Sequence, residues 1–424
     1  MTCARDRVGA ARRNGRRRAS WVLAMLASLA GAGDAAATAS PSSSPPAEQA
    51  RLLATATSIV PADIVPLARE DVLALTPEMR EWLHAQVPST LPPTDRLNLL
   101  VRRLQASDGA GLRYDAWFTV GAAEAFAAHR FNCLSFSHLV VAMARELGLR
   151  AYYIEARYRQ RYGREGDLVL LAGHITVGWG DSTNRWVVEF GNEARLDTAR
   201  VRQLSDVRAL ALHYSNLGAA ELRRGNPEKA LAALATAIEV DPRTAGAWVN
   251  LGVALRRRGD PAAAETAYRR AIAADPEMVP GWANLYSILR TSGRGKEASA
   301  LVADIMELNN RDPWLLLAMG DECFDARDFP CASRLFKKAR SEAHGEAAPA
   351  AALAALALAQ GDQARARKWV RKAEALDPRE PRLFRVRTAL GLPQPPIVAK
   401  SEPLPPADSA TMAMPPPDPP NPNR

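Results

Sequence analysis

Apolar residues in the second half of the chain recur with a period of 34 residues. Alanine occupies position 20 of every period, and leucine or methionine occupies position 7. Within each period, apolar residues lie three and four positions apart over two stretches, which is the spacing of amphipathic helices. The pattern predicts an all-α solenoid of five helical hairpins over 207–382. The five blocks are 211–244, 245–278, 279–312, 313–346 and 347–380.

The segment 61–206 changes from a helical to an alternating pattern. TPEMREWLHAQ, TDRLNLLVRRLQ and TVGAAEAFAAHR each begin with an N-capping threonine and continue with helical spacing. A fourth helix is expected from Asn132 to Leu147. AYYIEARY, LVLLAGHITVGW and RWVVEF then alternate β-branched or aromatic residues with polar ones, which predicts strands. A helical half followed by an antiparallel sheet indicates an α+β domain.

The two ends of the chain have neither pattern. Residues 1–18 hold seven arginines, and the apolar run that follows is too short to span a bilayer comfortably. With Ala37 and Ala39 in small-x-small spacing, 1–39 predicts a signal peptide cleaved near Ala39 and a periplasmic or secreted protein. No transmembrane segment is expected after cleavage. Residues 40–60 are interpreted as a mobile linker, and the proline-rich 383–424 as a disordered tail.

Most of the positive charge lies in the predicted leader. Its seven arginines, less Asp6 and Asp34, give +5, so 9 − 5 leaves +4 for the remaining chain. This small excess argues against nucleic-acid binding. No CxxC or HxxxH spacing occurs, so a zinc site is not expected.

Three cysteines remain after the leader. Cys323 and Cys331 fall on the two helices of the fourth block, where a disulfide is plausible. Cys133 is left over, at the first turn of a predicted helix. The helix dipole and unpaired backbone N–H groups stabilise a thiolate there. A buried small residue is the alternative interpretation of the same position.

Two polar residues on the predicted strands complement this cysteine. His174 points away from the apolar face of its strand, and so does Glu189 on the next strand. If the turn between them comprises residues 180–183, His174 lies directly opposite Glu189. A longer turn would change that register.

A cysteine that opens a helix, a histidine on a later strand and an acid on the next strand resemble the transglutaminase-like superfamily, whose fold is related to papain. More narrowly, FNCLSFSHLVVAMARELGLRAYYIEA, GHITVG and WVVEFGN resemble bacterial exported proteins that join this domain to tetratricopeptide repeats. The resemblance implies acyl transfer without a cofactor. Cys133 would be the nucleophile, His174 the base and then the acid, and Glu189 the group that orients the imidazole. The family usually has glycine where this chain has Phe131, and aspartate in place of Glu189.

The 34-residue blocks resemble tetratricopeptide repeats, which bind extended peptides or proteins along their first helices. Position 6 carries asparagine in three blocks, and arginines lie on or beside the same helical face. These residues predict a basic peptide groove, with a solvated helix face as the alternative. They are Asn216, Arg223, Asn250, Arg257, Asn284 and Arg290.

Two functional hypotheses follow. The first is an exported thiol hydrolase of peptidase or amidase type, whose array recruits a protein or peptide substrate. Hydrolysis is preferred over transamidation because no feature marks a second amine site. The second is a non-catalytic adaptor of the cell envelope with a degenerate transglutaminase-like domain. A calcium-dependent crosslinker is disfavoured because no acidic calcium loop occurs.

Overall fold

The structure is a computed structural model of the 424-residue chain. It describes residues 4–5, 46–157, 162–165, 168–171, 174–180, 185–188, 200–307 and 313–394. The chain divides into two compact units, Met1–Leu335 and Phe336–Arg424. The segment 61–206 therefore shares one unit with the repeats that follow it. Among the described residues, no helix is both long enough and apolar enough to cross a membrane.

Helices α2 to α5 come before strand β4 in the first unit. They are α2 (Pro77–Gln86), α3 (Pro93–Gln105), α4 (Ala122–Ala128) and α5 (Cys133–Glu146). Thr76 caps α2 by accepting a hydrogen bond from the Met79 N–H, as its position predicts. Helix α5 is buried along most of its length and contacts strands β4 and β7. It is the central helix of this core.

The main sheet has five strands in the order β1-β8-β7-β4-β9, and every neighbouring pair is antiparallel. Strands β2 and β3 form a separate parallel pair, and β5 and β6 a separate hairpin. The single strand predicted over 168–179 is thus two strands, β6 and β7, which belong to different sheets. The strands are β1 (Ala4–Arg5), β2 (Arg113–Tyr114), β3 (Arg130–Phe131), β4 (Ala151–Arg157), β5 (Tyr162–Glu165), β6 (Leu168–Leu171), β7 (His174–Gly180), β8 (Arg185–Val188) and β9 (Arg200–Leu204).

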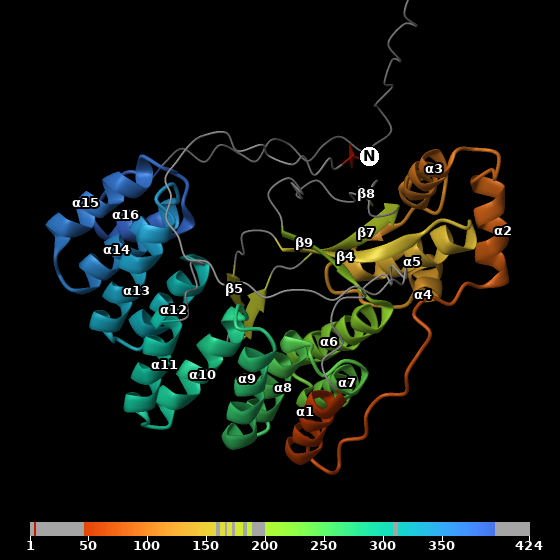
Figure 1. Cartoon of the computed structure of the whole chain (residues 1–424). Coiled ribbons are helices and arrows are strands. Elements are labelled where there is room, and N and C mark those ends of the chain that lie inside the picture. Colours follow the sequence, from red (N-terminus) through yellow and green to blue (C-terminus); the bar gives the residue numbers. More distant parts are fainter. Residues whose placement is uncertain are drawn as a thin grey trace, which may run out of the picture. The chain divides into compact units, whose positions relative to one another are not determined.

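Ten helices form the five hairpins of the array (Figure 1). Helices α8, α10, α12 and α14 each begin at the first residue of a predicted block, whereas α6 begins ahead of its block. The pairs are α6 (Asp206–Arg224) with α7 (Pro227–Val240), α8 (Ala245–Arg257) with α9 (Pro261–Ala274), α10 (Val279–Thr291) with α11 (Gly295–Glu307), α12 (Pro313–Asp325) with α13 (Phe329–Glu342), and α14 (Ala347–Ala359) with α15 (Gln363–Glu374).

Small residues allow the two helices of a hairpin to approach closely. A Cβ atom added at Gly252 would lie 2.4 Å from the Tyr268 ring, so a larger residue would push α8 and α9 apart. Between blocks, the Trp248 indole donates to the Pro242 carbonyl at 2.7 Å, and Trp282 repeats this contact with Pro276 at 2.9 Å. The proline that closes one block is therefore bonded to the tryptophan of the next.

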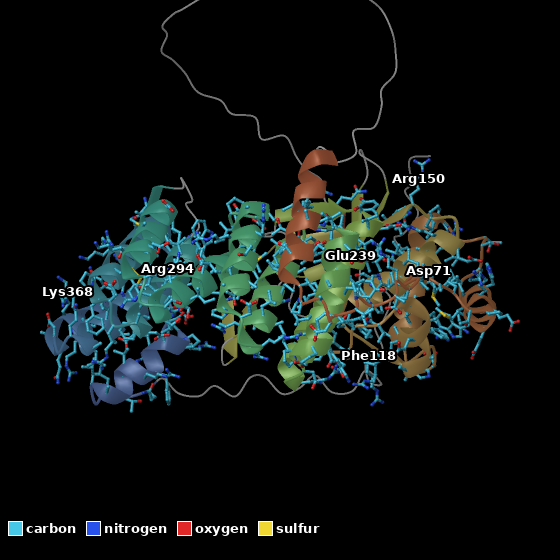
Figure 2. All side chains as sticks on the ribbon, turned by 90° about the horizontal axis from the view of Figure 1, so that it is seen from below. Asp71, Phe118, Arg150, Glu239, Arg294 and Lys368 are labelled. Atoms are coloured by element: carbon cyan, nitrogen blue, oxygen red, sulfur yellow. A yellow bond between two sulfur atoms is a disulfide. The ribbon has the colours of Figure 1, made fainter. Side chains whose placement is uncertain are left out.

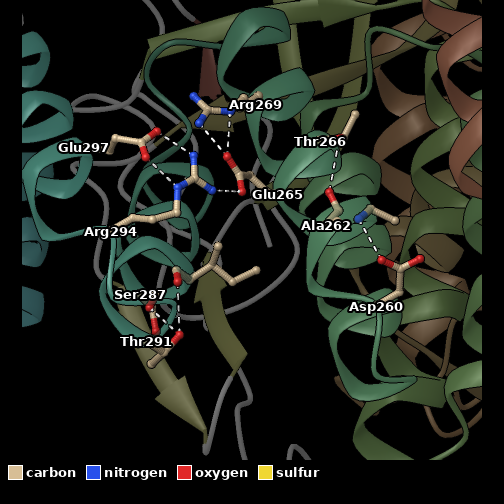
Figure 3. Close-up of polar contacts among 11 residues, drawn as sticks. Asp260, Ala262, Glu265, Thr266, Arg269, Ser287, Thr291, Arg294 and Glu297 are labelled. Atoms are coloured by element: carbon tan, nitrogen blue, oxygen red, sulfur yellow. Dashed lines mark hydrogen bonds and ion pairs between the residues drawn. The ribbon is translucent and has the colours of Figure 1, made fainter.

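An ion-pair network joins the second and third hairpins (Figure 3). Glu265 of α9 pairs with Arg269 on its own helix and with Arg294, just before α11, both at 2.6 Å. Arg294 also pairs with Glu297 at 2.5 Å. Figure 3 shows the Arg294 guanidinium between the two carboxylates. Its two partners hold α11 against the preceding hairpin.

The fourth hairpin differs from the others at its turn. Arg327 has a positive φ of 57° where the other hairpins have glycine. A disulfide joins Cys323 of α12 to Cys331 of α13, with the Cα atoms 5.7 Å apart. The disulfide that the sequence made plausible is therefore present. Among the described residues, Cys133 is the free cysteine. The disulfide holds together the hairpin whose turn sequence is least favourable.

The segment interpreted as a linker, 40–60, contains helix α1 (Pro46–Ile59). This helix contacts α7 and α9, and the Arg270 guanidinium donates to the Thr55 hydroxyl at 2.7 Å. Further along, the Leu67 N–H donates to the Thr236 hydroxyl at 2.7 Å. Because these contacts join residues far apart in sequence, the repeat pattern alone does not reveal them. The predicted leader falls on residues outside the described ranges, apart from β1, which pairs with β8.

Residues 383–389, predicted as disordered tail, belong to helix α16 (Pro381–Ala389). Leu383, Val386 and Leu390 are buried against α14 and α15 of the second unit. The Arg387 guanidinium also pairs with Glu374 of α15 at 2.5 Å. The three-and-four spacing of the buried residues covers the apolar face that the last hairpin would otherwise expose. Residues 395–424 lie outside the described part of the chain.

We expect Leu383→Ala to destabilise the second unit by about 2–5 kcal/mol, because the fully buried side chain leaves a cavity. The neighbouring Phe384 is 60% exposed, so Phe384→Ala should change stability by less than about 0.5 kcal/mol. Amide hydrogen exchange of α14 to α16 measures both. Equal protection in the two variants would show that α16 does not cap the array.

Candidate functional site

Cys133 is the first residue of α5 and follows the N-cap Asn132. The Asn132 side chain accepts a hydrogen bond from the Ser135 N–H at 2.9 Å and donates to the Thr119 hydroxyl at 2.6 Å. The Ser135 hydroxyl in turn donates to the Phe118 carbonyl at 3.0 Å. These bonds fix the helix start against the loop that precedes α4.

The Cys133 thiol faces strand β7. Backbone N–H groups of Ile175, Leu134 and Cys133 itself point at the sulfur, and each lowers the pKa of the thiol. Burial is the larger effect and raises this pKa above its ordinary value. The local donors act in the direction expected of a helix terminus, whereas loss of solvation around the partly exposed thiol acts against them and is the larger effect.

The structure places the backbone of His174 beside this thiol. His174 is the first residue of β7 and pairs with Ala156 of β4, while the next residue, Ile175, presents its N–H to the sulfur. Glu189 lies outside the described residues. A triad of Cys133, His174 and Glu189 therefore stays a prediction.

The register between β7 and β8 differs from the predicted one. For His174 to lie opposite Glu189, Val177 would have to pair with Trp186. Val177 instead pairs with Val188, a shift of two residues. Because the side-chain period of a strand is two, this shift changes which residues are opposite and leaves each on its expected face.

Phe131 fits its position without backbone strain. It lies in the extended strand β3 and is 3% exposed, and among the described residues the non-glycine positive φ values occur at His129 and Arg327. The left-handed residue near the cysteine is His129, whose Nδ1 lies 2.6 Å from the Ala110 carbonyl oxygen. Phe131 therefore lies in extended backbone, where a side chain is allowed.

A second group of histidines, not predicted as functional, is buried between α5 and α6. His138 Nδ1 lies 2.7 Å from the Tyr153 hydroxyl, and its ring centroid is 5.4 Å from that of His213. His213 Nε2 lies 2.7 Å from a Glu70 carboxylate oxygen. Burial lowers the pKa of His138 well below its ordinary value, and the nearby His213 acts in the same direction. His138 is therefore a buried, hydrogen-bonded residue of the core between α5 and α6.

Two of the predicted groove arginines lie at the ends of α6 and α8, which a hydrogen bond joins. The Arg257 guanidinium donates to the Leu222 carbonyl, and Arg223, the next residue along α6, stacks on the Trp117 ring at 4.2 Å. Both arginines are exposed. Trp117 is 39% exposed and belongs to the loop that contacts the start of α5. Sequence reasoning missed Trp117, because nothing in its spacing relates it to the repeats.

The predicted asparagine row is not uniform. Asn216 and Asn250 are partly exposed, but Asn284 is 2% exposed, and its side-chain nitrogen has no hydrogen-bond partner among the described residues. Its helix, α10, is contacted by strand β6 (Figure 1). Arg290 lies at the end of the same helix and is partly exposed. Of the six predicted groove residues, Asn284 is buried, and the other five are at least partly exposed.

Stability should fall as the pH drops below about 6.5, because His138 is held neutral in the folded protein and titrates normally when unfolded. The expected slope is at most about 1.4 kcal/mol per pH unit between pH 6.5 and 5. Urea unfolding at several pH values measures it. His138→Asn should flatten the slope, whereas His84→Asn, which changes an exposed histidine, should preserve it. An unchanged slope in His138→Asn would contradict the assignment.

Comparisons with known proteins concern the array. Residues 216–279 match a sequence model of the tetratricopeptide repeat family. TTC0263, a tetratricopeptide protein of Thermus thermophilus, is 23% identical over 43% of this chain and 100% of its own, with a TM-score of 0.33. PilF of Pseudomonas aeruginosa is 23% identical over 43% of this chain and 89% of its own (TM-score 0.31). PilW, a type IV pilus biogenesis factor, is 17% identical over 44% and 88% (TM-score 0.32).

The comparison with curated proteins gave no match. These matches concern the array and do not support a transglutaminase-like assignment for residues 61–206. The helical array itself is confirmed as a solenoid of the tetratricopeptide repeat type.

Proposed function

We propose that the protein is an interaction protein whose first two hairpins bind an acidic peptide segment of a partner. Tetratricopeptide repeats are protein-binding modules, and this property supports the general part of the proposal. The specific part rests on one observation: the Arg257 guanidinium of α8 donates to the carbonyl of Leu222, which directly precedes Arg223 at the end of α6. We further propose an exported location, on the strength of the arginine-rich leader.

The arginine pair suits carboxylate recognition. A guanidinium that stacks on an aromatic ring can still direct its N–H edge toward a carboxylate. Trp117 holds Arg223 in this way, and the Leu222 carbonyl holds Arg257. Asn216 and Asn250 on the same helices supply amide groups for the backbone of an extended peptide. Helix α10, of the third hairpin, is contacted by strand β6. The proposed peptide-binding surface is therefore limited to the first two hairpins.

The double change Arg223→Gln and Arg257→Gln should weaken binding of acidic peptides about tenfold or more, because each substitution removes a charge-assisted hydrogen bond. The probes are fluorescein-labelled synthetic peptide pools of matched length, one rich in Glu and Asp and one neutral, measured by fluorescence polarisation. The matched control is Arg224→Gln, since Arg224 is an exposed arginine next to Arg223 that pairs with Glu221 at 2.6 Å. Equal binding of both pools, or equal losses in the variants and the control, would overturn the acidic preference.

A thiol acyl-transfer enzyme is the second candidate, and the position of Ile175 favours it. Its N–H points at the Cys133 sulfur and is next to His174. In this reaction the sulfur would attack an amide carbonyl and the C–N bond would break. His174 would give its proton to the leaving amine, and water would hydrolyse the thioester. The raised pKa of Cys133 weighs against this candidate and favours the adaptor.

Alkylation of Cys133 by iodoacetamide separates the two functions. We expect the reaction of the folded protein to have a midpoint above about pH 8.5, the value of a free thiol, because burial disfavours the thiolate. The protein in urea, with Cys323 and Cys331 still paired, gives the reference midpoint for the same thiol. A midpoint below about pH 7 that rises in His174→Ala would establish a thiolate–imidazolium pair and favour the enzyme.

A further inference from the structure

The positive charge of the chain after the predicted leader is concentrated in the second unit. Its described residues, 336–394, hold twelve Lys and Arg and six Asp and Glu, so 12 − 6 gives +6. The whole chain after residue 39 has a net charge of +4. The rest of that chain is therefore close to neutral or slightly acidic, and this unit has a distinct electrostatic character.

Helix α15 carries much of this charge on one face. Ala366, Val370 and Ala373 are buried at positions i, i+4 and i+7. Lys368, Arg371 and Lys372 lie on the opposite side and are exposed (Lys368 is labelled in Figure 2). A helix with an apolar buried side and an uninterrupted basic side has the charge distribution of interfacial helices.

The acidic residues of this unit do not neutralise that face. In the described part of the unit, no carboxylate pairs with Lys368, Arg371 or Lys372. The carboxylates that form ion pairs are bonded to other cations. These pairs are Glu342 with Lys338, Asp362 with Arg365, Glu374 with Arg387, and Glu380 with Arg382. The three cations of α15 are thus available to an external anion.

Apolar side chains border the basic face. Two cations stack on the Trp369 ring, with Arg340 of α13 at 5.1 Å and Lys372 at 4.5 Å from its centroid. Leu376, in the turn after α15, is 42% exposed and follows Trp369 by seven residues, so it continues the same stripe of the helix. Tryptophan and leucine beside lysine and arginine are the residues that helices place at a lipid headgroup boundary.

We propose that the outer face of α15 binds the surface of an anionic lipid bilayer. Lys368, Arg371 and Lys372 would attract the headgroups, while Trp369 and Leu376 border the headgroup region. A bilayer fits this face better than an acidic protein does, because the cations cover one side of a helix without a matching arrangement of hydrogen-bond acceptors. This binding is independent of the peptide site on α6 and α8, which lies in the first unit.

The test is sedimentation of the chain from residue 40 to 424 with vesicles of phosphatidylcholine, either alone or mixed with about one third phosphatidylglycerol. We expect binding to the anionic vesicles only, and weaker binding at higher salt. Since each cation near an anionic surface contributes about fivefold, the triple change Lys368→Gln, Arg371→Gln and Lys372→Gln should lower the partition coefficient about a hundredfold.

The matched control removes the same net charge elsewhere. Arg102→Gln, Arg150→Gln and Lys296→Gln alter exposed cations of the first unit. The control should bind anionic vesicles within about twofold of the unaltered chain. Equal losses in the two triple variants would overturn the proposal in favour of general charge attraction, and so would an absence of vesicle binding. Circular dichroism of both variants excludes unfolding as the cause of a loss.

Discussion

A terminal hairpin of a repeat array leaves an apolar face open, and the rest of the structure depends on how such faces are covered. A hairpin buries its sides only against neighbours, so a terminal hairpin needs a different partner. At the C-terminal end that partner is α16, through Leu383 and Val386. At the N-terminal end it is the α/β segment (residues 61–206), because Ala209 and Leu212 of α6 belong to the same core as α5 and the sheet. The α/β segment is thus the N-terminal cap of the solenoid.

This capping role explains why the polar contacts around α6 are buried. Tyr214 donates its hydroxyl proton to the Ala68 carbonyl at 2.9 Å and accepts from the Glu70 N–H at 2.9 Å, so it anchors the chain before α2 to the first hairpin. His213 reaches Glu70 on one side and faces His138 of α5 on the other. Each of these groups leaves water on folding, and a specific partner offsets that loss. These contacts fix how the segment 61–206 packs against the first hairpin within the first unit.

The sequence predicts well those elements that local residue spacing determines. It predicts poorly those elements that depend on contacts with distant parts of the chain. The 34-residue period locates the first residue of α8, α10, α12 and α14, because each hairpin repeats the same local packing. The spacing of Leu383, Val386 and Leu390 was present in the sequence, but the prolines that follow it led to the prediction of a disordered tail. Helix α1 was overlooked because its partners lie on α7 and α9, far along the chain.

The candidate site shows the same contrast between features set by local sequence and features set by contacts across the fold. The cap at Asn132 and the place of Cys133 as first residue of α5 follow from residue types, and the structure has both. The direction of the thiol pKa depends on burial by β7, which no local pattern contains. The register of β7 and β8 likewise depends on their pairing across the sheet. Trp117 could be related to Arg223 only once the loop before α4 and the end of α6 were placed together.

The Trp117 loop connects the two sites physically. The carbonyl of its neighbour Phe118 accepts from Ser135 in the first turn of α5, while the Trp117 ring supports Arg223 at the end of α6. A peptide that displaces or orders the Arg223 guanidinium would therefore act on a loop bonded to the helix turn that carries Cys133. Under the adaptor proposal this loop is a rigid support, and the partly buried thiol packs against the core behind it. Under the enzyme proposal it would link substrate capture to the nucleophile. The adaptor and enzyme proposals involve the same contacts. The pKa of the Cys133 thiol distinguishes them.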